Sequence, residues 1–186
     1  MNSSIKTVST FIIVLLTMVS CKKVIIKTAE DYRIKYGNVT FGCFINGVPW
    51  VPNYGDPGSG VGPVSISNFA SGSPSAPFFY TVIEALSNYE RLTIYLPNDI
   101  IEKKYLLNYN SGIYPTNNKN LPSADFTKYY PYSVYTTNQN TTGYVNVTTV
   151  KYGNGGKIEG TFECELTLPS TNEKLLITNG YFKRQY

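Results

Sequence analysis

The chain has 186 residues, which is enough for one domain of ordinary size and too few for two comfortable ones. Its 16 Lys and Arg against 12 Asp and Glu leave a formal charge of +4, without a basic stripe that could follow phosphates, so nucleic acid is not expected as a partner. Histidine is absent from the sequence, which excludes every Ser-His-Asp, Cys-His or histidine-metal scheme.

The N-terminal segment has the architecture of a secretory signal. Lys6 precedes the apolar run 11–16, and small residues lead up to Cys21. The run is shorter than the roughly 20 apolar residues that a spanning helix needs. The segment resembles the bacterial lipobox, whose cysteine takes up a diacylglycerol and becomes the first residue after cleavage. We therefore expect residues 1–20 to be a lipoprotein signal peptide and Cys21 to be lipidated; the alternative is an ordinary secretory signal with an incidental cysteine.

The segment after Cys21 is polar and charged, without sustained periodicity. We expect residues 21–36 to be the lipidated N-terminus and a tether, and residues 37–186 to be one folded domain. The anchor makes the membrane a partner through the lipid.

Candidate strands in the first half of the domain lie at 39–46, 48–51, 64–70, 78–86 and 90–97. Leu92, Ile94 and Leu96 alternate with polar residues, which is the period of a half-buried strand. Residues 98–104 could form one helical turn with Asn98 as its N-cap. Glycine, asparagine and proline predict loops at 53–63 and 110–122.

The C-terminal half predicts a three-stranded antiparallel meander, from runs at 143–152, 157–168 and 174–184 that turn residues separate. In the middle run, apolar residues from Ile158 to Leu168 alternate with polar ones, so one face of the strand should lie against the core and the other should be exposed to solvent. With 17 Tyr, 9 Phe and 15 Gly, the chain is expected to be all-β. We predict a single antiparallel β-sandwich of roughly eight to ten strands, with an up-and-down β-barrel as the alternative.

Four short motifs, taken in this order, resemble one family. They are Phe41-x-Cys43-x-Ile45-Asn46-Gly47-x-x-Trp50, Leu92-x-Ile94, Gly160-Thr161-Phe162 and Ile177-Thr178-Asn179-Gly180-x-Phe182. The combination is similar to the small lipoproteins of Bacteroidetes that are grouped as domains of unknown function, of the DUF6252 and DUF5025 kind. The resemblance supplies no catalytic residues to carry over. The motifs also have a structural explanation, because Asn46-Gly47 and Asn179-Gly180 accept the positive φ angles of a turn or bulge.

The anchor and the family resemblance together predict a location in the cell envelope, at the outer membrane. Surface-displayed lipoproteins of Bacteroidetes carry acidic residues just after the lipidated cysteine, whereas this chain has Lys22 and Lys23 there. We therefore favour a domain that faces the periplasm, and the leaflet stays open.

Two cysteines of the domain, Cys43 and Cys164, fall on the apolar faces of predicted strands. In an oxidising compartment they could form a disulfide, provided that their Cα atoms lie within about 7 Å. The alternative is that both are small buried hydrophobes. Without histidine, a nucleophilic cysteine would lack its usual base.

Carboxylates offer the remaining candidates for chemistry. Glu159, Glu163 and Glu165 share one strand face and could resemble the carboxylate pair of a glycosidase. This is the solvent-exposed face, however, where charges are expected in any case. Asp56 with Asn53 could hold calcium, yet the regular ligand spacing is missing, and the glycine-rich run 58–62 lacks the lysine of a phosphate loop. We expect no enzyme activity, no metal and no cofactor.

Aromatic residues are the most suggestive feature. A platform for a glycan or an envelope protein could combine the lone tryptophan, Trp50, with the tyrosines of a second segment, Tyr129, Tyr130, Tyr132 and Tyr135. The competing explanation is that tyrosines fill strand positions and Trp50 plugs the core. The leading hypothesis is a non-catalytic binding module of the envelope. The rivals are a purely structural envelope protein with no small ligand, and a hydrolase.

Overall fold

The computed structural model describes residues 33–36, 39–53, 63–73, 76–97, 99–109, 121–153 and 155–185. This part of the chain forms twelve strands and no helix. The strands are β1 Ile34–Tyr36, β2 Val39–Ile45, β3 Val48–Trp50, β4 Val64–Ser73, β5 Ala76–Ser87, β6 Glu90–Pro97, β7 Lys104–Leu106, β8 Ser123–Tyr129, β9 Tyr132–Thr136, β10 Gly143–Lys151, β11 Lys157–Thr167 and β12 Lys174–Gln185. Among the described residues, none lies in a helix long and apolar enough to cross a membrane.

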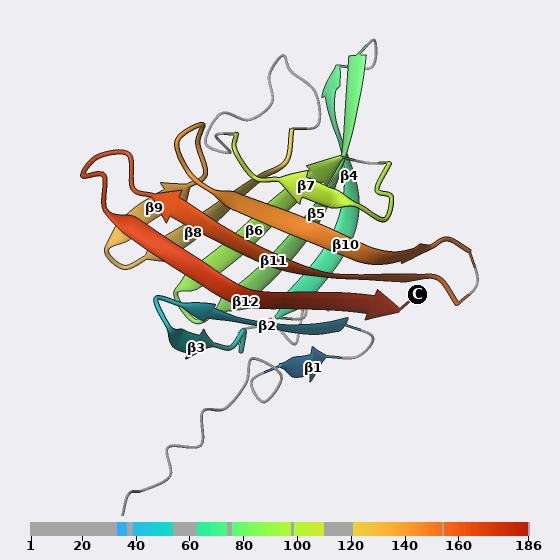
Figure 1. Ribbon diagram of the computed structural model, residues 1–186, viewed down its shortest axis with the longest axis horizontal. Coiled ribbons are helices and arrows are strands. Elements are labelled where there is room, and N and C mark those ends of the chain that lie inside the picture. Colours follow the sequence, from blue (N-terminus) through green and yellow to red (C-terminus); the bar gives the residue numbers. More distant parts are fainter. Residues whose placement is uncertain are drawn as a thin grey trace, which may run out of the picture.

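All these strands belong to one antiparallel sheet. Its order is β1-β2-β12-β11-β9-β8-β6-β5-β4, with β10 also paired to β11, β7 paired to β10, and β3 paired to β2. The sheet curls into a half-barrel, so that β2 approaches β4 although they lie near opposite ends of the order. In Figure 1 the strands β10, β11 and β12 cross over β4, β5 and β6. The all-β prediction is confirmed. The curled sheet combines the continuous hydrogen bonding of a barrel with the crossing layers of a sandwich.

Local sequence signals placed most of the strands. In β11 the residues Ile158, Gly160, Phe162, Cys164 and Leu166 are buried and alternate with more exposed neighbours, as predicted. The hairpin between β2 and β3 turns at Asn46 and Gly47, whose φ angles of 49° and 77° are both positive. Such dihedrals suit a two-residue turn that follows the twist of the strands.

Three sequence predictions need correction. Residues 99–103 contain bends and no helical turn, because the chain there leads straight into the short strand β7. The segment assigned to the tether contains β1, which pairs with β2. The sequence prediction lacks the hairpin of β8 and β9, although Ser123 to Thr127 alternate polar and apolar residues. In the structure the polar residues of this run are buried as well as the apolar ones.

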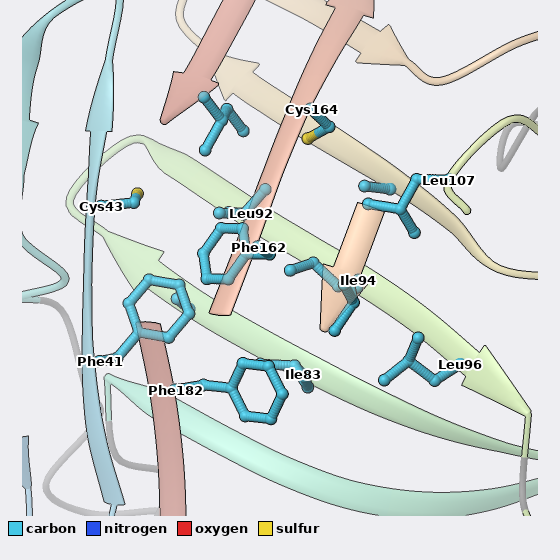
Figure 2. Close-up of a cluster of buried hydrophobic side chains, with 14 of the residues drawn as sticks. Phe41, Cys43, Ile83, Leu92, Ile94, Leu96, Leu107, Phe162, Cys164 and Phe182 are labelled. Atoms are coloured by element: carbon cyan, nitrogen blue, oxygen red, sulfur yellow. The ribbon is translucent and has the colours of Figure 1, made fainter. Parts of the chain in front are cut away.

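The core is one apolar cluster inside the curl. Five aromatic rings form a chain across it: Phe182 to Phe162 at 6.4 Å, Phe162 to Phe41 at 5.5 Å, Phe41 to Trp50 at 6.4 Å, and Trp50 to Phe126 at 5.8 Å between ring centroids. Figure 2 shows Phe41, Phe162 and Phe182 facing Ile83, Leu92 and Ile94 of β5 and β6. The chain of rings therefore joins β12, β11, β2 and β3 to β8, on the other side of the curl.

Candidate functional site

Trp50 lies inside the core, not at an exposed rim. Its side chain stacks edge-on against Phe41 and Phe126, and only 8% of the residue is exposed. The indole N–H donates a hydrogen bond to the Glu90 carboxylate, with 2.7 Å between Nε1 and Oε2. The ring packs between Phe41 of β2 and Phe126 of β8, and its polar atom has a partner, as buried tryptophans usually require. The prediction that Trp50 belongs to a ligand platform is wrong on this point.

Tyr135 is also buried, with 3% of the residue exposed. Its hydroxyl donates to Oε1 of Glu173 at 2.8 Å, which ties β9 to the turn before β12. The ring therefore contributes to packing between strands and cannot offer a face to a ligand. Two further tyrosines of the domain lie elsewhere: Tyr105 is buried, and Tyr109 borders a shallow hollow with Asn138 and Asn140.

The remaining predicted tyrosines do come together, and a fourth joins them. Tyr129 and Tyr132 are the last pair of the β8–β9 hairpin, and Tyr130 sits in its turn. The neighbouring β5–β6 turn supplies Tyr89, whose ring packs edge-to-face on Tyr130 with 5.5 Å between centroids. The Tyr129 N–H donates to the Tyr89 carbonyl at 2.8 Å and joins the two turns. We call Tyr89, Tyr129, Tyr130 and Tyr132 the tyrosine cluster.

The tyrosine cluster is strongly exposed for an aromatic surface. The exposed fractions are 79% for Tyr130, 73% for Tyr132 and 61% for Tyr89, and Tyr129 is partly covered. Sequence reasoning missed Tyr89 because the residue stands about 40 positions before its neighbours, and only the pairing of β6 with β8 brings the two turns together. The one sequence signal for its exposure is its position in a tight turn between two predicted strands.

A polar row runs from the tyrosine cluster along the outer face of the sheet. Arg91 lies opposite Thr127, and Thr93 lies opposite Asp125. The Arg91 guanidinium lies 3.9 Å from the Glu84 carboxylate and 6.0 Å from the centre of the Tyr129 ring. One charged side chain is thus shared between a carboxylate and a ring of the cluster.

Asp125 is a buried carboxyl group on this face. The hydroxyls of Thr93 and Tyr95 donate hydrogen bonds to it, but its Oδ1 has no hydrogen-bond partner among the described residues. Burial raises the pKa of Asp125 to about 6, although Arg91 and the two hydrogen bonds act in the opposite direction. The group therefore changes its charge in the range where most carboxylates are fully ionised.

The two cysteines of the domain are free thiols in the structure. Both are buried in the core, and β12 lies between their strands β2 and β11. Two strand spacings separate such positions by about 10 Å, beyond the reach of a disulfide. Burial raises the pKa of the Cys164 thiol to about 12 and that of Cys43 well above its ordinary value. Protonated and enclosed, both thiols pack as small hydrophobes.

The glutamates of β11 do not converge on a common centre. Glu159 pairs with Lys157 and accepts a hydrogen bond from the Tyr181 hydroxyl, while Glu165 pairs with Lys174 at 3.0 Å. Partial burial opposes ionisation of Glu159, but its hydrogen bonds with Lys157 and Tyr181 outweigh this and lower its pKa. Within the described residues, no group of cysteine, aspartate or glutamate side chains is arranged to hold a metal ion.

Several predicted features lie outside the described residues. These are Cys21 with the signal and most of the tether, the glycine-rich run 58–62, and Asp56. Asn53, the other residue considered for calcium, is described; its backbone N–H donates to the Leu86 carbonyl at 3.1 Å, beside the β5–β6 turn.

Comparison with known proteins gives one match. A family model described as a domain of unknown function, DUF6252, matches residues 79–185, which run from β5 to β12 and include the whole tyrosine cluster. The strands β1 to β4 precede the matched region, although β2 carries part of the core. No curated protein and no solved structure matches the chain. Since the match spans more than half of the sequence, the chain belongs to the DUF6252 family.

Proposed function

We propose that this protein is a non-catalytic binding module of the bacterial cell envelope, and that the tyrosine cluster is its contact surface for a partner protein. The observation that carries the proposal is the joint exposure of Tyr89, Tyr130 and Tyr132 on two turns that a backbone hydrogen bond joins. Soluble proteins usually bury rings of this size, and exposed aromatic groups gather where another surface covers them.

A protein partner is favoured over a glycan. Sugars stack on an open, flat ring face, whereas Tyr89 and Tyr130 stand at an interplanar angle of 85° and do not form one flat surface. Tyrosine with a neighbouring arginine is the composition of the anchor residues in protein interfaces. Arg91 takes that position, beside Tyr129. The non-catalytic reading is supported by the glutamates of β11, which are engaged with lysines or a tyrosine hydroxyl.

The surface can be tested by site-specific crosslinking in living cells. A photoreactive phenylalanine analogue at position 130 or 132 should give a discrete adduct, because these side chains would lie in the interface. The control is position 152, because Tyr152 is 74% exposed but follows β10 at the opposite end of the sheet (Figure 1). Once the partner is known, Tyr130→Ser should weaken binding by about tenfold or more, as expected for an interface anchor.

The crosslinking result also separates the alternatives. An adduct that depends on position 130 or 132 and keeps its size after treatment with glycan-degrading enzymes supports a protein partner. An adduct that glycan-degrading enzymes reduce to the size of the uncrosslinked chain would replace the protein with a glycan. Equal labelling at 152 and 130, or none at 130 and 132, would contradict the binding module and leave the purely structural envelope protein.

We also propose that a lipid on Cys21 anchors the module to the outer membrane. The support is the order of Lys6, the apolar run 11–16 and the cysteine in the sequence. Growth with a labelled fatty acid should label the wild-type protein, and Cys21→Ser should abolish the label. The variant Cys43→Ser should keep it, because that thiol is enclosed in the core. A Cys21→Ser protein that still takes up the label would contradict the anchor.

A further inference from the structure

Arg91 occupies a position from which it can reach two different partners on β8. In the register of β6 and β8 it lies opposite Thr127, and the outward side chains on either side of Thr127 are Asp125 and Tyr129. Diagonal neighbours of this kind have Cβ atoms about 7 Å apart, within reach of a long side chain. The arginine is therefore midway between a buried carboxyl group and a ring of the tyrosine cluster.

Neither contact is complete in the structure. The guanidinium lies 6.0 Å from the centre of the Tyr129 ring, which is the outer limit of a cation–π contact. The Nε atom of Arg91 and the Oδ1 atom of Asp125 are both buried, and neither has a hydrogen-bond partner among the described residues. The register makes Arg91 and Asp125 diagonal neighbours, so a small movement of the arginine can pair this donor with this acceptor.

We propose that Arg91 alternates between the Asp125 carboxylate and the Tyr129 ring, and that the charge on Asp125 selects the partner. When Asp125 is ionised, the guanidinium moves toward it and leaves the face of the Tyr129 ring open. When Asp125 is protonated, its attraction is lost, and the guanidinium, which still has Glu84 as a neighbour at 3.9 Å, shifts onto the ring. The effect on partner binding rests on the function proposed above, whereas the movement itself does not.

The groups around Asp125 set the pH at which the change occurs. Glu84 of β5 disfavours the carboxylate, while Arg91, Thr93 and Tyr95 of β6 favour it. The β9 residue opposite Asp125 is Thr136, which carries no charge. Burial outweighs the favourable groups and raises the pKa of Asp125 to about 6. Below this pH the carboxyl group is neutral, so acidification should move Arg91 onto Tyr129 and cover that ring.

The movement can be followed by NMR on the full-length protein in mild detergent, with labelled aspartate carboxyl carbons, arginine Nε atoms and tyrosine rings. Between about pH 5 and pH 7.5, the range around a pKa near 6, the signals of Asp125, Arg91 and Tyr129 should titrate with one midpoint. The Arg91 protons should shift upfield at low pH as they enter the ring current. The ring of Tyr152, which lies at the other end of the sheet, serves as the reference.

Two variants complete the test. In Asp125→Asn, Arg91 and Tyr129 should keep the wild-type low-pH signals at every pH, because the amide is neutral throughout. In Glu84→Gln the common midpoint should fall, because a neighbouring negative charge is removed. An Asp125 titration without movement of Arg91 and Tyr129, or a movement that persists in Asp125→Asn, would overturn the proposal.

The consequence for binding is measured separately. The yield of the position-130 adduct should fall roughly twofold to fivefold on acidification through pH 6, the size of a surface cation–π contact, and Asp125→Asn should abolish this pH dependence. If the NMR titration is observed and no adduct forms at any pH, the Arg91 movement stands and the binding function is wrong. If the adduct forms but its yield does not depend on pH in either the wild type or Asp125→Asn, the regulatory consequence is overturned.

Discussion

Replacing Trp50 with alanine should lower the free energy of unfolding by about 3–5 kcal/mol, the range for removing a large buried aromatic ring. The indole contacts Phe41 on one side of the curl and Phe126 on the other, so its loss opens a cavity at the end of the core. It also leaves the Glu90 carboxylate without its donor at 2.7 Å. Urea unfolding followed by circular dichroism measures the change without relying on tryptophan fluorescence.

The matched control is Trp50→Phe, which keeps a ring between the two neighbours and removes the indole N–H. We expect a smaller loss, about 1.5–3 kcal/mol, which is the range for one hydrogen bond to a charged group. A Trp50→Ala protein that loses less than about 1 kcal/mol would behave like a surface substitution. That result would contradict the core position and return Trp50 to the candidate platform.

Replacing Gly160 with alanine should destabilise the fold by about 3 kcal/mol, the upper part of the range for overpacking. A Cβ atom at this position would lie 2.5 Å from the Asn146 carbonyl oxygen and 2.7 Å from Cζ of Phe182. The oxygen belongs to the backbone of the paired strand β10, so relieving the clash requires the hydrogen-bonded ladder to shift. The phenylalanine is held by the ring chain of the core, with Phe162 6.4 Å away.

The control for this substitution is Thr161→Ala, one residue along the same strand with an exposed side chain. Its effect should stay within about 1 kcal/mol, the span of strand propensities. Thermal unfolding of both variants at one pH gives the comparison. Equal stability of Gly160→Ala and the wild type would mean that β10 and β11 do not approach as closely as the structure shows.

The sequence determined the class of fold, and the reason is local. Alternating side chains mark a strand with one buried face, and this is how β6 and β11 were found from residues such as Leu92, Ile94 and Phe162. A turn dipeptide specifies a hairpin through its own backbone angles. The positive φ angles that Asn46 and Gly47 accept are therefore enough to predict the β2–β3 hairpin from the local sequence. The strand β8 carries the same alternation, but its polar residues Ser123, Asp125 and Thr127 are buried too, which the pattern alone does not predict.

The candidate site depended on contacts that no local signal encodes. Trp50, Tyr130 and Tyr135 are all large aromatic residues, and composition gives each the same tendency to be buried or exposed. Only the curl of the sheet decides that Trp50 and Tyr135 enter the core while Tyr130 remains at a turn. Likewise, Tyr89 reaches Tyr130, and Arg91 stands between Asp125 and Tyr129, because β6 pairs with β8 in one particular register. A shift of that register by one residue would turn every side chain of the strand to the opposite face, so the surface is a property of the pairing and not of either segment alone.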